Sequence, residues 1–307
     1  MKALVTGGAG FIGSHVAEAL LEDGAEVLII DNLSTGKKAN LPQKAAFLEL
    51  DICSEELKKV ILEFKPEIIF QLAAQIDVQK SIFDPAFDAY VNIVGAIKLL
   101  EAAREAKVKK IVYSSSAAVY GEPCFLPVTE EHQILPLSAY GISKHTVEHY
   151  LTAYKKLYNI NYSILRYGNV FGPRQDPLGE AGVVAIFTSK VLKGEPCFIF
   201  GDGKQTRDFV YVKDIAAANL LAAKAPGSQI VNIATGVETS INEVFALLRD
   251  LSGQNQSQVI RKEARQGEIR RMVMSTEKAK KEIGYNSKYT FLDGIKETIA
   301  YYQNGKI

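Results

Sequence analysis

The sequence has little net charge, few cysteines and no long apolar run. Lys and Arg number 36 against 35 Asp and Glu, which gives a formal net charge of +1. Such a balance offers no reason to expect binding to nucleic acid or to a membrane surface. The cysteines, Cys53, Cys124 and Cys197, are three in number, far apart and without metal-ligand spacing. This pattern predicts a reduced, cytoplasmic protein without a metal site. No stretch has transmembrane length, and none reads as a secretory signal.

What the sequence does contain is a regular alternation of strand and helix patterns. Its 307 residues, 47% of them hydrophobic, suffice for one large domain or two modest ones. The expected strands are 3–6, 26–30, 47–50, 67–70, 110–113 and 163–166. The expected helices are 11–22, 55–64, 86–106 and 139–158. This alternation predicts an α/β fold, a Rossmann-type doubly wound parallel sheet with helices on both faces.

The alternation of strand and helix patterns ends after residue 168, where Gly and Pro become frequent. Loops around one helix, 183–192, are expected up to residue 207. A helix at 212–224 and a strand at 229–233 then read as a return to the main sheet. We therefore expect a sheet domain over residues 1–168, rejoined by 211–235, and a smaller mixed lobe over 169–307. That lobe would cover the carboxyl ends of the strands, where open α/β sheets bind ligands.

The segment Thr6–Gly13, Thr-Gly-Gly-Ala-Gly-Phe-Ile-Gly, lies between the first expected strand and the first helix. Gly7 permits a sharp turn, Gly10 leaves room for a pyrophosphate, and Gly13 allows close packing of the helix. The helix N-terminus would direct N–H groups and a partial positive charge at the phosphates. The segment therefore predicts a dinucleotide site.

Asp31 ends the second strand, 18 residues after Gly13. A carboxylate there accepts hydrogen bonds from the adenosine ribose and repels a 2′-phosphate, which favours NAD over NADP. Lys37 and Lys38 lie nearby and keep NADP as an alternative. Asp51 and the residue after it end the third strand, where an adenine ring could rest. Small residues after the fourth strand would let the backbone approach the cofactor.

Tyr140 and Lys144 lie four residues apart on the helix 139–158 and so share one face. A tyrosine is a weak base at neutral pH because its ordinary pKa is about 10. An adjacent ammonium group and a positive nicotinamide ring would both favour the phenolate. The serines of Ser114–Ser116 end the fifth strand at the same sheet edge, where one hydroxyl could bridge a substrate oxygen and the phenol.

These patterns, together with a family resemblance that adds Gln75 and Tyr167, give a set of candidate cofactor-binding residues. They are Gly7, Gly10, Phe11, Ile12, Gly13, Asp31, Asn32, Ser34, Thr35, Gly36, Asp51, Ile52, Leu72, Ala73, Ala74, Gln75, Ser114, Tyr140, Lys144 and Tyr167.

Seven segments carry a resemblance that runs essentially end to end. They are Thr6–Gly13, Asp31–Gly36, Leu72–Gln75, Ser114–Gly121, Tyr140–Lys144, Leu165–Gln175 and Arg207–Asp214. On these motifs the chain resembles the extended short-chain dehydrogenases/reductases of the NAD-dependent sugar-nucleotide epimerase/dehydratase family. Within that family it is most similar to the shorter bacterial and archaeal UDP-glucose 4-epimerases. The resemblance implies an isomerase that uses NAD, a UDP-sugar substrate and a homodimer.

The resemblance also implies roles for single residues. Ser116 matches the catalytic hydroxyl, Tyr140 the base and Lys144 its partner. The candidate substrate-binding residues are Ser116, Tyr140, Asn169, Arg207, Arg265 and Glu268. A nucleotide sugar carries two phosphate charges, and arginine side chains are suitable partners for them.

Three positions depart from the usual pattern of the family. Gln71 stands where relatives often carry His, and Ala118 where many epimerases carry Thr. Met272 stands at a position thought to limit the space around sugar C2, and its flexibility suggests that N-acetyl sugars also fit. The Asp-Glu pair of the dehydratases is replaced by Ala117 and Ala118, so that only proton and hydride exchange remain available.

The expected function is therefore interconversion of UDP-glucose and UDP-galactose by transient oxidation at C4 and non-stereospecific hydride return. One alternative is 4-epimerisation of another UDP-sugar, such as UDP-GlcNAc, UDP-glucuronate or a UDP-pentose. Another is a non-catalytic NAD-binding sensor, which the presence of Ser116, Tyr140 and Lys144 disfavours.

Overall fold

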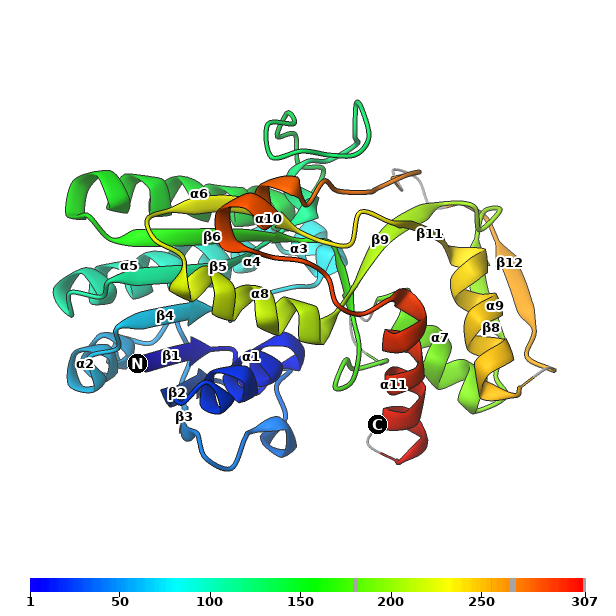
Figure 1. The fold of residues 1–307 in the computed structure, drawn as a ribbon, viewed down its shortest axis with the longest axis horizontal. Coiled ribbons are helices and arrows are strands. Elements are labelled where there is room, and N and C mark those ends of the chain that lie inside the picture. Colours follow the sequence, from blue (N-terminus) through cyan, green and yellow to red (C-terminus); the bar gives the residue numbers. More distant parts are fainter. Residues whose placement is uncertain (179–181, 255, 265–268, 306–307) are drawn as a thin grey trace.

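The computed structural model describes residues 1–178, 182–254, 256–264 and 269–305, and its core is a sheet of seven parallel strands (Figure 1). The sheet has the order β10-β6-β5-β4-β1-β2-β3. Its strands are β1 Lys2–Thr6, β2 Glu26–Asp31, β3 Ala46–Glu49, β4 Ile68–Gln71, β5 Lys110–Ser116, β6 Asn161–Tyr167 and β10 Gln229–Ile233. The prediction of a doubly wound parallel sheet is confirmed, and residues 229–233 lie in this sheet, paired with β6.

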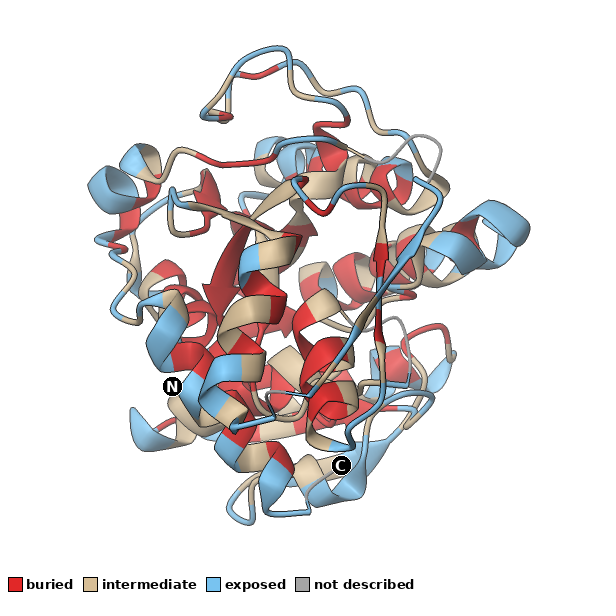
Figure 2. Ribbon diagram, turned by 90° about the vertical axis from the view of Figure 1, so that its right-hand side faces the viewer, coloured by how far each residue is buried: buried red, intermediate tan, exposed pale blue. Residues whose placement is uncertain are grey.

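Helices cover both faces of this sheet, so that its strands are buried on both sides. The helices α1 (Phe11–Glu22) and α8 (Val212–Lys224) pack together on one face. On the other face lie α2 (Glu56–Phe64), α5 (Gly95–Glu105) and α6 (Ala139–Tyr158). Successive residues of β1 alternate between the two cores: Ala3 and Val5 face α1, whereas Leu4 packs with the α2–α5 layer. Figure 2 shows buried strands enclosed by helices with exposed outer faces.

The smaller lobe contains short strands that the sequence analysis did not predict. In order, β11 (Glu238–Ser240), β9 (Thr206–Tyr211) and β7 (Asn169–Phe171) form one sheet, and β12 (Val259–Lys262) and β8 (Cys197–Phe200) another. The helices α7 (Val183–Leu192), α9 (Ile241–Ser252) and α11 (Phe291–Gln303) pack around them (Figure 1). The expected helix 183–192 is confirmed as α7, but the expectation that only loops surround it before residue 207 was wrong.

The expected helix 86–106 is interrupted by a wider turn. It consists of α4 (Pro85–Ala89), a π-helical segment η2 (Tyr90–Val94) and α5. Asn92 within η2 exchanges hydrogen bonds with the backbone of Gln75 in both directions, N–H to Oδ1 at 2.8 Å and Nδ2 to carbonyl at 3.0 Å. Single π turns of this kind occur frequently at functional sites.

The remaining short helices are α3 (Val78–Phe83), α10 (Glu277–Ile283), η1 (Lys38–Asn40) and η3 (Ala117–Val119). Ala279, Ile283 and Tyr285 belong to the core beside α1 and α8. The chain therefore returns to the large sheet once more near residue 280, a return that the sequence analysis did not predict.

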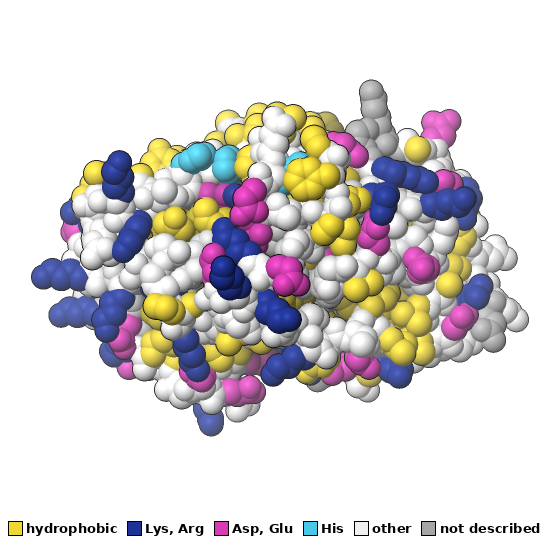
Figure 3. All heavy atoms as spheres, turned by 45° about the horizontal axis from the view of Figure 1, so that its top comes forward, with side chains coloured by type: hydrophobic (Ala, Val, Ile, Leu, Met, Phe, Trp, Pro, Cys, Tyr) yellow, Lys and Arg dark blue, Asp and Glu magenta, His cyan; other side chains and the backbone are white. Residues whose placement is uncertain are grey.

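The surface carries both signs of charge intermixed with small apolar areas on the face shown in Figure 3. This agrees with the near-zero net charge of the whole chain. Within the described ranges, no helix combines the length and the hydrophobicity that a membrane crossing would require.

The packing of the glycine turn gives a stability prediction. A Cβ atom at Gly13 would lie 2.1 Å from the Gly7 carbonyl oxygen, whereas one at Gly10 would have its nearest contact at 3.2 Å. Gly13→Ala should lower the free energy of unfolding by more than about 2 kcal/mol because backbone has to move. Gly10→Ala, the matched control, should cost less than about 1 kcal/mol. Urea unfolding of the cofactor-free proteins measures both, and equal midpoints for Gly13→Ala and native protein would contradict the prediction.

Candidate active site

A cavity of about 430 Å³ opens at the carboxyl ends of the central strands, and most of the predicted site residues line it. The sheet order changes direction between β1 and β4, the position at which doubly wound sheets bind ligands. The predicted residues in its lining are Gly7, Gly10, Phe11, Ile12, Gly13, Asp31, Asn32, Ser34, Thr35, Asp51, Ile52, Leu72, Ala73, Ala74, Ser114, Ser116, Tyr140, Lys144, Tyr167 and Asn169.

The glycine turn forms one wall of the cavity. Gly7 has a φ of 73°, and a Cβ atom there would lie 2.7 Å from the backbone nitrogen of Ala73. Only glycine therefore fits between the ends of β1 and β4. The N-cap of α1 is Gly10, which provides no side-chain cap. The amides at the start of α1 thus face a cavity without a competing hydroxyl or carboxylate cap, as an anion site requires.

Asp31 closes the other side of this wall. Its carboxylate accepts hydrogen bonds from the amides of Ala9 at 3.0 Å and Leu33 at 2.8 Å. A Cβ atom at Gly36 would lie 2.8 Å from Asp31 Oδ1, so Gly36 gives the carboxylate its space although it does not line the cavity. Asp51 is held in place by Asn32 Nδ2 at 2.7 Å.

The chemical centre lies where β5 ends against α6. Lys144 Nζ donates to the carbonyl oxygen of Ser114 at 2.8 Å and lies 5.8 Å from the centre of the Tyr140 ring. The Ser116 hydroxyl oxygen accepts from the amide of Ala118 at 3.1 Å, which begins η3. The Ser116 side chain also lies near enough to the Tyr140 phenol to lower its pKa. Three groups suited to proton transfer thus lie side by side.

Burial shifts the pKa values of these groups toward their neutral forms. Desolvation raises the pKa of Tyr140 to about 12, although the hydrogen bond with Ser116 acts in the opposite direction. Desolvation also lowers the pKa of Lys144 to about 8, against the influence of Asp88. Desolvation thus dominates the pKa of Tyr140 in the protein without its cofactor, and the expectation that Lys144 and a nicotinamide ring together favour the phenolate stays a prediction.

Several predicted residues lie elsewhere. Gln75 does not line the cavity; its side chain donates to Asp88 Oδ1 at 2.9 Å within a buried network. Arg207 on β9 also lies outside the lining, and its Nη1 donates to the carbonyl oxygens of Thr206 and Ile269, both at 2.8 Å. Arg265 and Glu268 lie outside the described residues.

The three departures from the family pattern have distinct surroundings. Gln71 and Ala118 do not line the cavity in the described part of the chain. Met272 is 4% exposed and packs in a cluster with Val119 and Tyr120. The structure therefore gives no support to Met272 as a gate for the sugar.

The number and position of the carboxylates in the described cavity lining limit the chemistry available there. Among the described lining residues, the only acids are Asp31 and Asp51, at the ends of β2 and β3 and away from Tyr140. No described group of three or more His, Cys, Asp or Glu side chains could hold a metal ion. The described groups beside Tyr140 can therefore take one proton from an alcohol group and return it.

The sequence analysis missed part of the lining. The missed residues are Leu50, Ile76, Val78, Val91, Ser115, Gly168, Val170, Gln175 and Gly182. Some of these, such as Ser115 and Gln175, lie inside motifs that were recognised and could have been included. Val78 and Val91 lie on α3 and η2, whose approach to the cavity has no signal in the local sequence.

The fold and the grouping of Ser116, Tyr140 and Lys144 define a short-chain dehydrogenase/reductase type of NAD-binding enzyme. A family model described as the NAD dependent epimerase/dehydratase family matches residues 3–234. The chain belongs to this family.

Individual relatives match over nearly the whole chain. A putative UDP-glucose 4-epimerase of Methanocaldococcus jannaschii is 47% identical over 302 residues, 98% of either chain. The UDP-glucose 4-epimerase structure of Thermotoga maritima with UDP-glucose has a TM-score of 0.97 and 44% identity, and covers 100% of both chains. The structure of the Thermus thermophilus UDP-glucose 4-epimerase with NAD has a TM-score of 0.94 and 41% identity, and covers 99% of both chains.

The buried ammonium of Lys144 gives a pH prediction for the cofactor-free protein. Its pKa is about 8 in the folded chain against an ordinary 10.5, so the unfolded chain binds more protons between these values. Native stability should then rise with pH across this window. Lys144→Met should be more stable than native protein at pH 7, by on the order of 2 kcal/mol, and this gain should vanish near pH 10.5.

Urea unfolding at pH 7 and pH 10 measures this difference. Lys193→Met, which changes an exposed lysine, should show no such pH dependence. A Lys144→Met effect that is equal at both pH values would contradict the assignment of a buried, charged Lys144.

Proposed function

We propose that the protein is an NAD-dependent UDP-glucose 4-epimerase, which interconverts UDP-glucose and UDP-galactose. The observation that carries this proposal is the position of Ser116, Tyr140 and Lys144 beside a dinucleotide cradle, with no described acid among them. Such a set can remove one proton from a secondary alcohol and return it, which is what epimerisation through a 4-keto sugar requires.

The described residues fit the cofactor. The turn at Gly7 leaves no space for a side chain, the start of α1 has no capping side chain, and Asp31 is fixed by two amides. In this assignment the turn holds the pyrophosphate, and Asp31 holds the adenosine ribose and excludes a 2′-phosphate. Bound NAD⁺ supplies the reversible two-electron oxidation of the sugar alcohol.

The chain's own residues handle the proton. Tyr140 takes it from the sugar 4-hydroxyl and later returns it, while Ser116 holds the same oxygen. Lys144, fixed by the Ser114 carbonyl, supplies positive charge beside the phenol and a donor for the nicotinamide ribose. The positively charged nicotinamide ring of NAD⁺ would favour the phenolate form of Tyr140, which the protein alone disfavours.

The nucleotide end of the substrate requires cationic groups. We assign Asn169, Arg207, Arg265 and Glu268 to this end of the site. Asn169 lines the cavity, and the Arg207 guanidinium is tied to the carbonyl of Ile269, the residue directly after Glu268 in the chain. A diphosphate bound there keeps the sugar attached while its ring turns over.

The alternatives fit less well. A dehydratase needs acids after the catalytic serine, and Ala117 and Ala118 stand there. A sensor needs the cradle but has no use for Ser116 and Tyr140. The suggestion that N-acetyl sugars also fit depended on Met272, which is buried in a cluster with Val119 and Tyr120 and does not line the cavity.

The deciding experiment measures turnover with NAD⁺ and UDP-glucose or UDP-galactose. Native protein should interconvert the two, and Tyr140→Phe should lower kcat by about 10² to 10⁴ with NAD still bound, because proton transfer is lost. A native protein without turnover would refute the function. A Tyr140→Phe variant of near-native kcat would refute the role of the phenol.

We also propose a homodimer formed through the helices beside α6. The helices α3 and α4 and the segment η2 contact α6, and they leave large apolar side chains exposed. These side chains are Ile82, Phe83, Phe87, Tyr90 and Val94, and α6 itself adds Leu157 and Tyr158. A second copy of the chain is their simplest cover, since such faces pair readily about a two-fold axis.

Sedimentation tests the dimer. Native protein should sediment as a dimer, and Phe87→Glu with Val94→Glu should sediment as a folded monomer, because charge would enter an apolar contact. Val237→Glu changes an exposed apolar residue elsewhere and should leave the dimer intact. A native monomer at micromolar concentration would contradict the proposal.

A further inference from the structure

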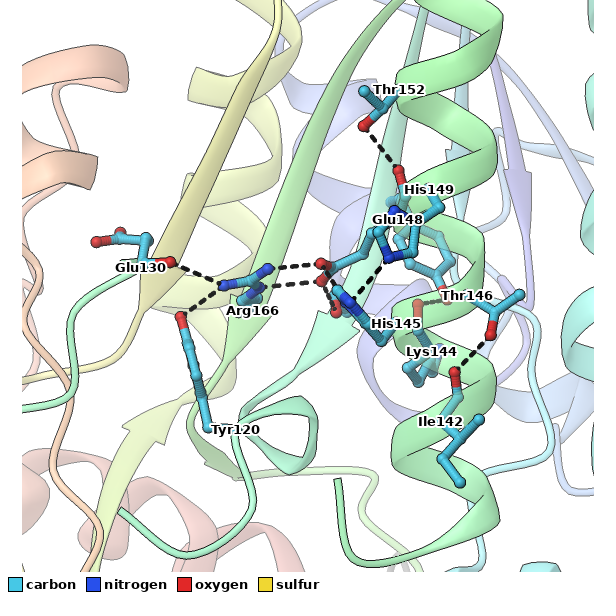
Figure 4. Close-up of polar contacts among 12 residues, drawn as sticks. Tyr120, Glu130, Ile142, Lys144, His145, Thr146, Glu148, His149, Thr152 and Arg166 are labelled. Carbon is cyan, nitrogen blue, oxygen red and sulfur yellow. Dashed lines mark hydrogen bonds and ion pairs between the residues drawn. The ribbon is translucent and has the colours of Figure 1, made fainter. Parts of the chain in front are cut away.

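A buried ion pair lies directly behind the chemical centre. Glu148 on α6 and Arg166 on β6 are 3% and 4% exposed and meet through two hydrogen bonds (Figure 4). Arg166 Nε donates to Glu148 Oε1 at 3.0 Å, and Nη2 donates to Oε2 at 2.6 Å. Burial alone would raise the pKa of Glu148, but its contacts with His145, Arg166 and Ser115 hold that pKa down at about 2. The mechanism proposed above does not use either residue.

The pair is connected to the catalytic strand through Ser115. The Ser115 hydroxyl donates to Glu148 Oε1 at 2.6 Å, and Ser115 is the direct neighbour of Arg166 in the pairing of β5 with β6. Because side chains alternate along a strand, the side chain of Ser115 points to the opposite face of β5 from those of Ser114 and Ser116, and it reaches Glu148. Glu148 therefore links β5 to β6, and it contacts β5 at Ser115, the residue between Ser114 and Ser116.

The pair is also connected to the catalytic helix. Tyr140, Lys144 and Glu148 are spaced by four residues on α6 and so form one stripe. Lys144 contacts Ser114, and Glu148 contacts Ser115, so the helix is attached to the strand at two successive points. Both attachments lie within about two turns of Tyr140 on the helix and within two residues of Ser116 on the strand.

Further groups brace the pair from other elements. Arg166 Nη1 donates to the Tyr120 hydroxyl at 2.9 Å, and that hydroxyl donates to Asn232 on β10 at 2.7 Å. His145 Nδ1 lies 3.1 Å from Glu148 Oε2 and completes its surroundings. Figure 4 shows Arg166 between Tyr120 on one side and α6 on the other. Two strands and the helix thus hold one carboxylate in a single position.

We propose that Glu148 and Arg166 are positioning residues for the epimerase reaction, which set the contact between Ser116 and Tyr140. This inference rests on the proposed function. It assigns to the pair a role in catalysis that is separate from stability. Buried ion pairs often contribute little net stability, and apolar replacements of both partners are frequently tolerated.

The test replaces both partners by apolar groups of similar size, Glu148→Leu with Arg166→Met, so that no uncompensated charge remains. The double variant should unfold near the native midpoint and retain NAD. Its kcat for UDP-glucose should fall at least about tenfold with little change in KM, since the reacting groups and not the binding groups are displaced. The control Tyr154→Phe removes a hydrogen bond to Glu101 farther along α6 and should keep kcat within about twofold of native.

A second comparison separates positioning from a general structural effect. If the pair acts through Ser116, replacing the pair should lower kcat much less in a Ser116→Ala background than in the native background. An equal loss of kcat in both backgrounds would overturn the proposal. So would a double variant whose kcat lies within twofold of native.

A third measurement does not depend on turnover. The Tyr140 phenol is titrated in NAD-bound protein by the ultraviolet absorbance difference between each protein and its Tyr140→Phe counterpart. Loss of the Ser116 hydrogen bond in the double variant should raise the pKa of Tyr140 above its value in native protein. A native protein without epimerase activity would remove the proposed function, and this titration alone would then decide: an unchanged pKa would refute the positioning role.

Discussion

Parallel pairing of the central strands is the constraint on which the rest of the structure depends. Parallel strands bring their carboxyl ends to one edge of the sheet, so residues far apart in the sequence meet there. β1 leads into the glycine turn, β2 ends at Asp31, and β5 ends at Ser116. One register of the sheet therefore places the cofactor residues and the chemical residues around a single cavity. The small lobe adds groups to this edge but does not create it.

Burial then determines the chemical state of the site. The same desolvation that raises the pKa of Tyr140 to about 12 lowers that of Lys144 to about 8, so burial shifts each group toward its uncharged form. Glu148 lies on the same helix and is equally buried, yet its pKa is shifted toward the charged form because His145, Arg166 and Ser115 contact its carboxylate. The difference between Lys144 and Glu148 is therefore the number of partners and not the depth of burial.

Local sequence patterns predicted those features that depend on neighbours in the chain. Helices α1, α6, α7 and α8 and strand β10 have the predicted bounds, since amphipathic spacing and turn residues determine them. The strands β7 and β11 have only three residues each and form through pairing with β9, which no local pattern reveals. The direction of a side chain was equally hidden: Gln75 follows a strand end as expected but points into a buried network with Asp88 and Asn92.

The path of the chain between the two lobes has a consequence for how the protein unfolds. The chain leaves the large sheet after β6, returns with α8 and β10, leaves again through β11, and returns a second time with α10. Neither core can therefore lose its structure without removing segments on which the other depends. The two lobes should melt together in a single cooperative transition, although they have separate hydrophobic cores.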